Sequence, residues 1–273
     1  MSELCDQNCA GCNANCGERV ACPGFQGTTS KVRKVIGVVS GKGGVGKSLV
    51  TALLASASAK RGLRAAILDA DITGPSIPKL FGIHEQVLSD GRFIRPAVTA
   101  GGIKAVSMNL CLPDEGEPVV WRGPMIAGVV KQFWEEVDWG EVDCMFADMP
   151  PGTGDVPLTV FQSLPVKGIV VVTTPQELVG MIVKKAVRMA ELMKIPVLGL
   201  VENMAYFQCP DCGKRHDIFG KSHVEETAAS LGIGAFARIP IEPGLAALCD
   251  QGRVEDFNAS EWLAPILGVI EKL

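Results

Sequence analysis

The stretch Gly41-Lys42-Gly43-Gly44-Val45-Gly46-Lys47-Ser48 matches the phosphate-loop pattern G-x-x-x-x-G-K-[ST] at every required position. The apolar run before it, residues 34–40, predicts a buried strand, and residues 49–60, rich in Ala and Leu, predict a helix. Glycines let backbone N–H groups converge on a polyphosphate, and the N-terminus of the helix favours negative charge. The stretch therefore predicts a nucleotide site between a strand and a helix.

Individual roles follow from the chemistry of this loop. Lys47 is expected to neutralise the β and γ phosphates of ATP, and the Ser48 hydroxyl to bind Mg²⁺. Leu49, which opens the expected helix, completes the predicted nucleotide contact. Lys42 follows the first glycine, where the general pattern requires no lysine, so on the pattern alone it is a solvent-exposed loop residue.

Composition limits the classes of protein. The 273 residues are 47% hydrophobic and 21% charged, which suits one large α/β domain, expected over residues 31–273 after a separate segment at 1–30. The net charge of −4 predicts neither a nucleic acid nor an anionic membrane surface as partner. The N-terminus lacks the features of a signal peptide and no run of about 18 apolar residues occurs, so a cytoplasmic protein is expected.

Half of the ten cysteines fall within the first 22 residues, among small and polar residues that cannot form a core. Closely spaced thiolates suit an iron–sulfur cluster or zinc, and a redox-active or unliganded tail is the remaining alternative. The candidate ligands of such a cluster are Cys9, Cys12, Cys16 and Cys22.

Carboxylates follow two of the expected strands. The strand at residues 64–68 leads into Asp69 and Asp71, and the strand at 143–147 leads into Asp148. Carboxyl ends of parallel strands gather where open sheets bind their ligands, and a carboxylate beside a phosphate must act through a metal or water. Asp71 is expected to orient the attacking water, Asp69 to support the metal shell, and Asp148 to hold Mg²⁺ through water.

The remaining pattern completes an α/β fold with a doubly wound, mainly parallel sheet. Residues 93–107 predict a hairpin appended to the sheet, and Met181 is expected in the core face of a helix at 178–193. Further strands are expected at 168–173, 196–202 and 236–239, and a final helix from about Glu261. Asn203 directly follows one of these strands.

Residues 209–213, Cys-Pro-Asp-Cys-Gly, form the pattern of a metal-binding turn. Cys209 and Cys212 supply only half of a four-ligand site. The other half comes either from a second subunit across a two-fold axis or from His216 and His223 of the same chain, as a zinc site.

Five motifs in order carry a family resemblance: the phosphate loop, Asp-Ala-Asp-Ile-Thr-Gly-Pro-Ser at 69–76, Trp-Arg-Gly-Pro-Met at 121–125, Asp-Met-Pro-Pro-Gly-Thr-Gly-Asp at 148–155, and Glu-Asn-Met-Ala-Tyr-Phe-x-Cys-Pro-x-Cys at 202–212. Over residues 32–270 the chain resembles the Mrp/ApbC/Nbp-type ATP-binding iron–sulfur cluster carriers. These belong to the phosphate-loop NTPases with a deviant Walker A loop. The eukaryotic scaffolds of this type place a cysteine where this chain has Glu18, so the N-terminal cysteines depart from their pattern.

The resemblance implies a homodimer that binds a labile [4Fe-4S] cluster at the paired Cys209 and Cys212 and passes it to apo iron–sulfur proteins, with weak ATP hydrolysis. It implies that Lys42 crosses the dimer interface to the partner's phosphates and takes part in catalysis. It also implies that Asn203 hydrogen-bonds adenine.

Two other functions share the phosphate loop. An ATP-driven electron-transfer protein like nitrogenase iron protein would need bridging cysteines near Cys111 and Cys144, where no suitable motif occurs. A positioning ATPase of the Min/Par type would need a basic or amphipathic tail, whereas only Lys272 adds positive charge to the final helix.

Removal of residues 1–22 is expected to leave a folded, ATP-binding protein, because this segment offers no apolar core. Circular dichroism during thermal unfolding and ATP titration check this prediction. Loss of the cooperative unfolding transition would contradict it. Iron analysis of the same variant separates a cluster site, which removes about one cluster per chain, from a tail, which removes none.

Overall fold

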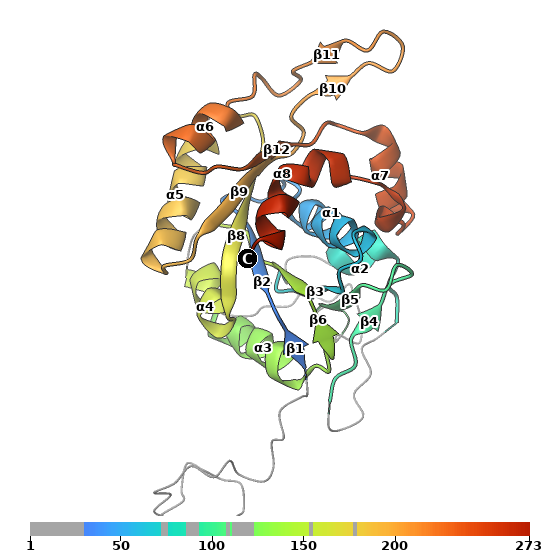
Figure 1. Ribbon diagram of the computed structural model, residues 1–273, viewed down its shortest axis with the longest axis vertical. Coiled ribbons are helices and arrows are strands. Elements are labelled where there is room, and N and C mark those ends of the chain that lie inside the picture. The colour runs from blue at the N-terminus through green and yellow to red at the C-terminus, as the bar shows by residue number, and fades with distance from the viewer. Residues whose placement is uncertain are drawn as a thin grey trace, which may run out of the picture.

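The computed structural model describes residues 30–71, 76–85, 93–107, 110, 123–152, 155–176 and 179–273. An eight-stranded sheet with the order β12-β9-β8-β2-β7-β3-β5-β4 forms its centre (Figure 1). Every neighbouring pair is parallel except β4 with β5. The strands are β2 (Val35–Ser40), β3 (Ala65–Asp69), β4 (Ala97–Val98), β5 (Lys104–Ser107), β7 (Cys144–Asp148), β8 (Val166–Thr173), β9 (Val197–Glu202) and β12 (Phe236–Arg238). The predicted doubly wound, mainly parallel α/β fold is confirmed.

Helices cover both faces of the sheet. One face carries α1 (Lys47–Lys60), α2 (Ser76–Phe81), α7 (Pro243–Asp250) and α8 (Ser260–Glu271). The other carries α3 (Gly123–Glu136), α4 (Asp155–Ser163), α5 (Val179–Leu192) and α6 (Val224–Ser230). Shorter elements are β1 (Lys31–Val32) paired with β6 (Glu141–Val142), β10 (Phe207–Gln208) paired with β11 (Arg215–His216), and the 3-10 turn η2 (Val254–Asp256).

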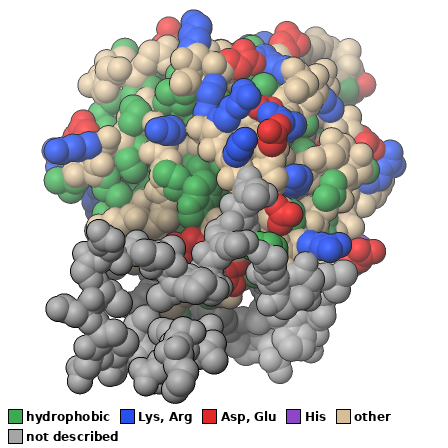
Figure 2. Space-filling view, turned by 60° about the horizontal axis from the view of Figure 1, so that its bottom comes forward, with side chains coloured by type: hydrophobic (Ala, Val, Ile, Leu, Met, Phe, Trp, Pro, Cys, Tyr) green, Lys and Arg blue, Asp and Glu red, His purple; other side chains and the backbone are tan. Residues whose placement is uncertain are grey.

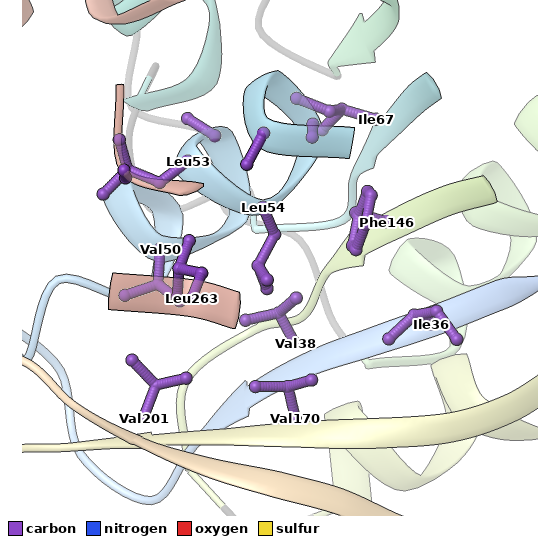
Figure 3. Close-up of a cluster of buried hydrophobic side chains, with 14 of the residues drawn as sticks. Ile36, Val38, Val50, Leu53, Leu54, Ile67, Phe146, Val170, Val201 and Leu263 are labelled. Carbon is purple, nitrogen blue, oxygen red and sulfur yellow. The ribbon is translucent and has the colours of Figure 1, made fainter. Parts of the chain in front are cut away.

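Successive side chains of a strand point to opposite faces of the sheet, so the apolar core forms two clusters, one on each face. In β2, Ile36 and Val38 pack under α1 and α8, while Val35 and Val39 pack toward the helices of the other face. Figure 3 shows the first cluster, where side chains of the central strands, such as Ile36, Phe146 and Val170, meet those of α1 and α8. Because a parallel sheet is covered on both faces, its strands are apolar at almost every position, which is why these strands were recognisable as continuous apolar runs.

The helix after the phosphate loop, α1, is buried along most of its length. Its apolar residues lie on all sides, so it packs against the sheet, α2 and α8 at the same time. Leu53 and Leu54 are at most 1% exposed. The N-terminal end of α1 is therefore held in a fixed position relative to the strands.

Some local predictions were wrong or incomplete. Met181 was expected in the core and is 63% exposed, because α5 turns Val183 and Ala186 inward instead. The pairs β1–β6 and β10–β11 were not anticipated, since two-residue strands leave no periodic signal. The expected hairpin within 93–107 is confirmed as β4 and β5. Residues 1–29, with their cysteines, lie outside the described residues.

Charged side chains of both signs share the surface. On the face in Figure 2, Lys and Arg lie among Asp and Glu. At the N-terminal end of the sheet, Arg64 Nη2 lies 2.8 Å from Asp143 Oδ1, and Arg64 also pairs with Glu141. Among the described helices, none combines the length and the apolar character needed to cross a bilayer.

Gly199 in β9 lets Ile266 of α8 pack directly against the strand. A Cβ there would lie 2.3 Å from Ile266 Cδ1 and 2.9 Å from the Ala235 carbonyl oxygen. We expect Gly199→Ala to lower the free energy of unfolding by about 1–3 kcal/mol through overpacking. Urea titration measures this. In the control Gly128→Ala, the new methyl group of α3 meets nothing within 4 Å, and stability should stay unchanged or rise by up to about 1 kcal/mol. Equal stability of the two variants would contradict the prediction.

Candidate functional site

The phosphate loop connects β2 to α1 at the carboxyl edge of the sheet. Gly44 and Gly46 have φ angles of +80° and +82°, a left-handed conformation that residues with a Cβ rarely adopt. Gly46 accepts the first hydrogen bond of α1 from Val50 N at 3.0 Å. The Ser40 hydroxyl donates to the Lys42 carbonyl oxygen at 3.0 Å and holds the other end of the loop. The loop thus has the curled backbone that its glycines predict.

Lys47 lies between two of the predicted carboxylates. Its Nζ is 2.8 Å from Asp148 Oδ1 and 3.1 Å from Asp71 Oδ2, and the side chain is 6% exposed. Burial lowers the pKa of Lys47, but the charges of Asp148 and Asp71 outweigh burial and leave the pKa above its usual value. The ammonium group is therefore charged, and the three side chains form one ion-paired group.

Asp148 is the most enclosed member of this group, with no exposed surface. Ser48 Oγ donates to its Oδ2 at 2.6 Å, and Thr51 Oγ1 donates to its Oδ1 at 2.8 Å. Burial raises the pKa of Asp148, while Lys47 and these hydroxyl groups oppose the rise. Thr51 was missed from the sequence, although it lies one helical turn after Lys47 and so on the same face of α1.

Asp69 supports Asp71 through the backbone. Its Oδ1 accepts a hydrogen bond from Asp71 N at 3.0 Å, and its Oδ2 accepts one from Ser107 Oγ at 2.8 Å. Burial, and then the charge of Asp148, raise the pKa of Asp69 well above its usual value. Ser107 was also missed, and its position at the end of β5, next to β3, is the signal that would have found it.

A cavity of about 430 Å³ opens beside the loop. It is lined by the phosphate loop, Asp71, Pro151, and residues of α2 and α7. Cys249 is half-buried and lines this cavity with Asp250. The space adjoins both the loop and the ion-paired group, as a nucleotide site requires.

Two predicted residues lie at the edges of the loop. Lys42 is exposed, and its Nζ is 3.4 Å from Gln176 Oε1. Asn203 is 2% exposed and its Nδ2 donates to the Val45 carbonyl oxygen at 3.0 Å. Its expected contact with adenine stays a prediction, because the amide contact seen here is with the loop itself.

The predicted metal-binding turn lies on the β10–β11 arm, which projects from the body of the domain (Figure 1). Cys209 N donates to the Lys214 carbonyl oxygen, and Gly213 N donates to the Cys209 carbonyl oxygen, both at 2.9 Å. Backbone N–H groups of Cys212 and Asp211 lower the pKa of the Cys209 thiol. Since Cys212 is exposed and Cys209 partly exposed, the turn presents two accessible sulfur atoms at its surface.

The histidines considered for a zinc site do not join these cysteines. His216 is exposed on β11, and His223 Nδ1 contacts Glu226 Oε2 at 3.0 Å. Within the part of the chain that the structure describes, no three His, Cys, Asp or Glu side chains are grouped to hold a metal ion. Cys9, Cys12, Cys16 and Cys22 lie outside the described residues.

A parallel sheet whose first strand leads through a glycine-rich loop into a helix, with acidic residues ending the neighbouring strands, defines a P-loop NTPase. Residues 31–273 match the family described as ParA: NUBPL iron-transfer P-loop NTPase. The chain belongs to this family.

Relatives support the assignment along the chain. The iron-sulfur cluster carrier protein of Clostridium perfringens is 44% identical over 268 residues, covering 95% of this chain and 94% of that protein. The protein of the same name from Methanocaldococcus jannaschii is 44% identical over 250 residues, covering 89% of this chain and 86% of that protein.

Solved structures agree with the fold. The nucleotide-binding protein of Archaeoglobus fulgidus, solved in complex with ADP, superimposes with a TM-score of 0.75 at 47% identity, covering 82% of this chain and 88% of that chain. The cell division ATPase MinD of Pyrococcus furiosus has a TM-score of 0.64 at 18% identity, covers 88% of this chain and 98% of that chain, and shares the fold.

The position of Asp71 next to Lys47 generates a prediction for hydrolysis. We expect Asp71→Asn to slow ATP hydrolysis by about 100-fold while ATP still binds, because orienting the attacking water matters mainly in the transition state. Steady-state hydrolysis and ATP titration measure the two effects. The control Lys47→Ala should abolish binding, since it removes the charge that faces the phosphates. Loss of ATP binding by folded Asp71→Asn would instead indicate a metal-site role.

Proposed function

We propose that this protein is an ATP-dependent iron–sulfur cluster carrier that holds a labile [4Fe-4S] cluster across a homodimer and transfers it to apo iron–sulfur proteins in the cytoplasm. The observation that carries the proposal is the pair of cysteines on the β10–β11 arm, Cys212 exposed and Cys209 partly exposed; the arm leaves the same edge of the sheet as the phosphate loop. The names and high coverage of the carrier relatives support it.

The cluster is the cargo of the protein, and its chemistry requires a second chain. A [4Fe-4S] cluster takes about four thiolates, while one arm offers Cys209 and Cys212. A two-fold axis beside the arm supplies the other two, since each chain contributes the same pair. Backbone N–H groups that lower the pKa of Cys209 favour the thiolate that binds iron. Exposure of the arm suits release to a recipient protein better than permanent storage.

The ion-paired group performs the nucleotide chemistry in this proposal. The oxygens of Ser48 and Asp148, 2.6 Å apart, are the hard donors that Mg²⁺ prefers, so these residues suit a magnesium–nucleotide complex. The ion supplies charge neutralisation to the phosphates. When a polyphosphate enters, Lys47 exchanges its pairing with Asp71 for phosphate oxygens, which leaves the Asp71 carboxylate to orient water. Lys42, exposed at the start of the loop, extends to the nucleotide of the partner subunit.

The electron-transfer alternative receives less support from the described cysteines. Cys144 is 1% exposed within β7, and burial raises the pKa of its thiol to about 12. A thiol in this environment neither ionises near neutral pH nor reaches a partner chain. The N-terminal cysteines remain candidates for a second cluster.

The proposal predicts that Cys209→Ala and Cys212→Ala each abolish cluster transfer while ATP binding survives, because either change leaves too few thiolates for the shared cluster. Transfer to an apo-ferredoxin after anaerobic reconstitution, followed by its absorbance, measures this. The control His216→Ala changes an exposed side chain of the same arm and keeps every thiol, so it should transfer normally. Wild-type protein should carry this cluster only as a dimer, and a monomer holding one metal ion through a single arm would refute the shared site.

A further inference from the structure

Asn203 packs directly against the phosphate loop. Its Nδ2 donates to the Val45 carbonyl oxygen at 3.0 Å, and a Cβ placed on Gly46 would lie 2.2 Å from the same nitrogen. No side chain fits between them at Gly46, so the amide and the loop backbone are in immediate contact. If the loop shifts when phosphate binds, the Asn203 side chain must therefore either move with it or resist the movement.

The chain around Asn203 is held firmly to the sheet. Asn203 N donates to the Thr173 carbonyl oxygen at 2.8 Å, and Ala205 N donates to the Ile239 carbonyl oxygen at 2.9 Å. Between these two bonds Met204 has a φ of +55°, a left-handed conformation that costs a residue with a Cβ about 1 kcal/mol or more. Backbone strain of this kind persists only where the surroundings impose it.

The same segment continues directly into the β10–β11 arm, and further contacts hold it there. Ile241 N donates to the Tyr206 carbonyl oxygen at 2.7 Å. The Tyr206 ring has the guanidinium carbon of Arg215, in the arm, 4.5 Å from its centroid, and that of Arg238, in β12, at 5.6 Å. Both distances are within the range of cation–π attraction, so Tyr206 links the arm to the body of the domain. Cys209 follows three residues later.

We propose that residues 203–209 form a mechanical link between the two sites, in which Asn203 is a positioning residue that couples nucleotide occupancy of the phosphate loop to the geometry of Cys209 and Cys212. The identity of the cargo rests on the proposed function, whereas the link itself rests on the contacts of this segment. Coupling of two sites is reciprocal, so the state of the arm also changes nucleotide affinity by the same factor.

The test uses the full chain without metal and measures the thiols directly. Iodoacetamide alkylation of Cys209 and Cys212 is followed by residue-resolved mass spectrometry, with and without magnesium-ADP at a concentration that saturates each protein. Wild-type protein should show a change in rate of about five-fold or more on nucleotide binding. Asn203→Ala should bring this ratio close to one, because the amide contact is lost.

The matched control is Ser40→Ala, which removes a different side-chain hydrogen bond to a loop carbonyl oxygen, also of 3.0 Å, without touching the link. It should keep the wild-type ratio even if it weakens nucleotide binding. A loss of the ratio in Ser40→Ala equal to that in Asn203→Ala would mean that general loosening of the loop is responsible, and would overturn the assignment.

A second variant keeps the test decisive if Asn203→Ala fails to fold or to bind ADP. Met204→Gly leaves the amide contact in place and relieves the left-handed strain, yet it makes residues 203–209 more flexible. The fold-change in alkylation rate on nucleotide binding should therefore be about half of the wild-type fold-change or less. A wild-type protein whose alkylation rates are the same with and without nucleotide would overturn the link. So would a Met204→Gly variant, together with Asn203→Ala if that variant folds, that keeps the wild-type ratio of the two rates. Because no cluster takes part in this test, its outcome does not depend on iron binding. A failure of Cys209 and Cys212 to bind iron would overturn the proposed function and leave the link untouched.

Discussion

The buried ion-paired group of Lys47, Asp148 and Asp71 is the interaction on which the rest of the site depends. An ammonium ion this deep in the protein is stable only with close carboxylates, and a carboxylate as enclosed as Asp148 is stable only with a cation and hydroxyl donors. The buried ammonium group and the buried carboxylate stabilise each other at the carboxyl ends of β2, β3 and β7. The parallel sheet provides this position, since only parallel strands bring their carboxyl ends to one edge.

Much of this arrangement could be predicted from the sequence, because its signals are local. The phosphate loop, the carboxylates at strand ends and the apolar runs of the central strands each occupy a few consecutive residues. Contacts between distant elements could not be predicted in this way. Nothing near Asp69 in the sequence identifies Ser107 as its partner, and nothing near Asn203 shows that its amide faces Val45, since both depend on the order of the strands. Met181 was misplaced because a long apolar side chain on a helix gives periodicity without showing which helix face meets the sheet.

Cys144 and Cys209 lie in contrasting environments. Cys144 is buried in a central strand, and burial raises the pKa of its thiol, so the thiol stays protonated and behaves as a small apolar side chain. Cys209 lies in a tight turn whose backbone N–H groups point to its sulfur, so the thiolate is favoured. Counting cysteines in the sequence indicates metal chemistry in general, whereas the exposure and the hydrogen bonds of each thiol decide which of them can bind iron.

The short outer strands of the sheet have a consequence for how two copies associate. Among the residues that the structure describes, β4 has two residues and β12 has three, so neither of these border strands is long enough to continue the sheet readily into another molecule. Many dimers form by such edge-to-edge pairing, and this fold disfavours it on both sides. The proposed homodimer would therefore use another surface, and both the phosphate loop and the β10–β11 arm leave from the carboxyl edge of the sheet. In the proposed dimer, the short borders would leave the carboxyl edge as the surface where the nucleotides and thiols of the two copies face each other.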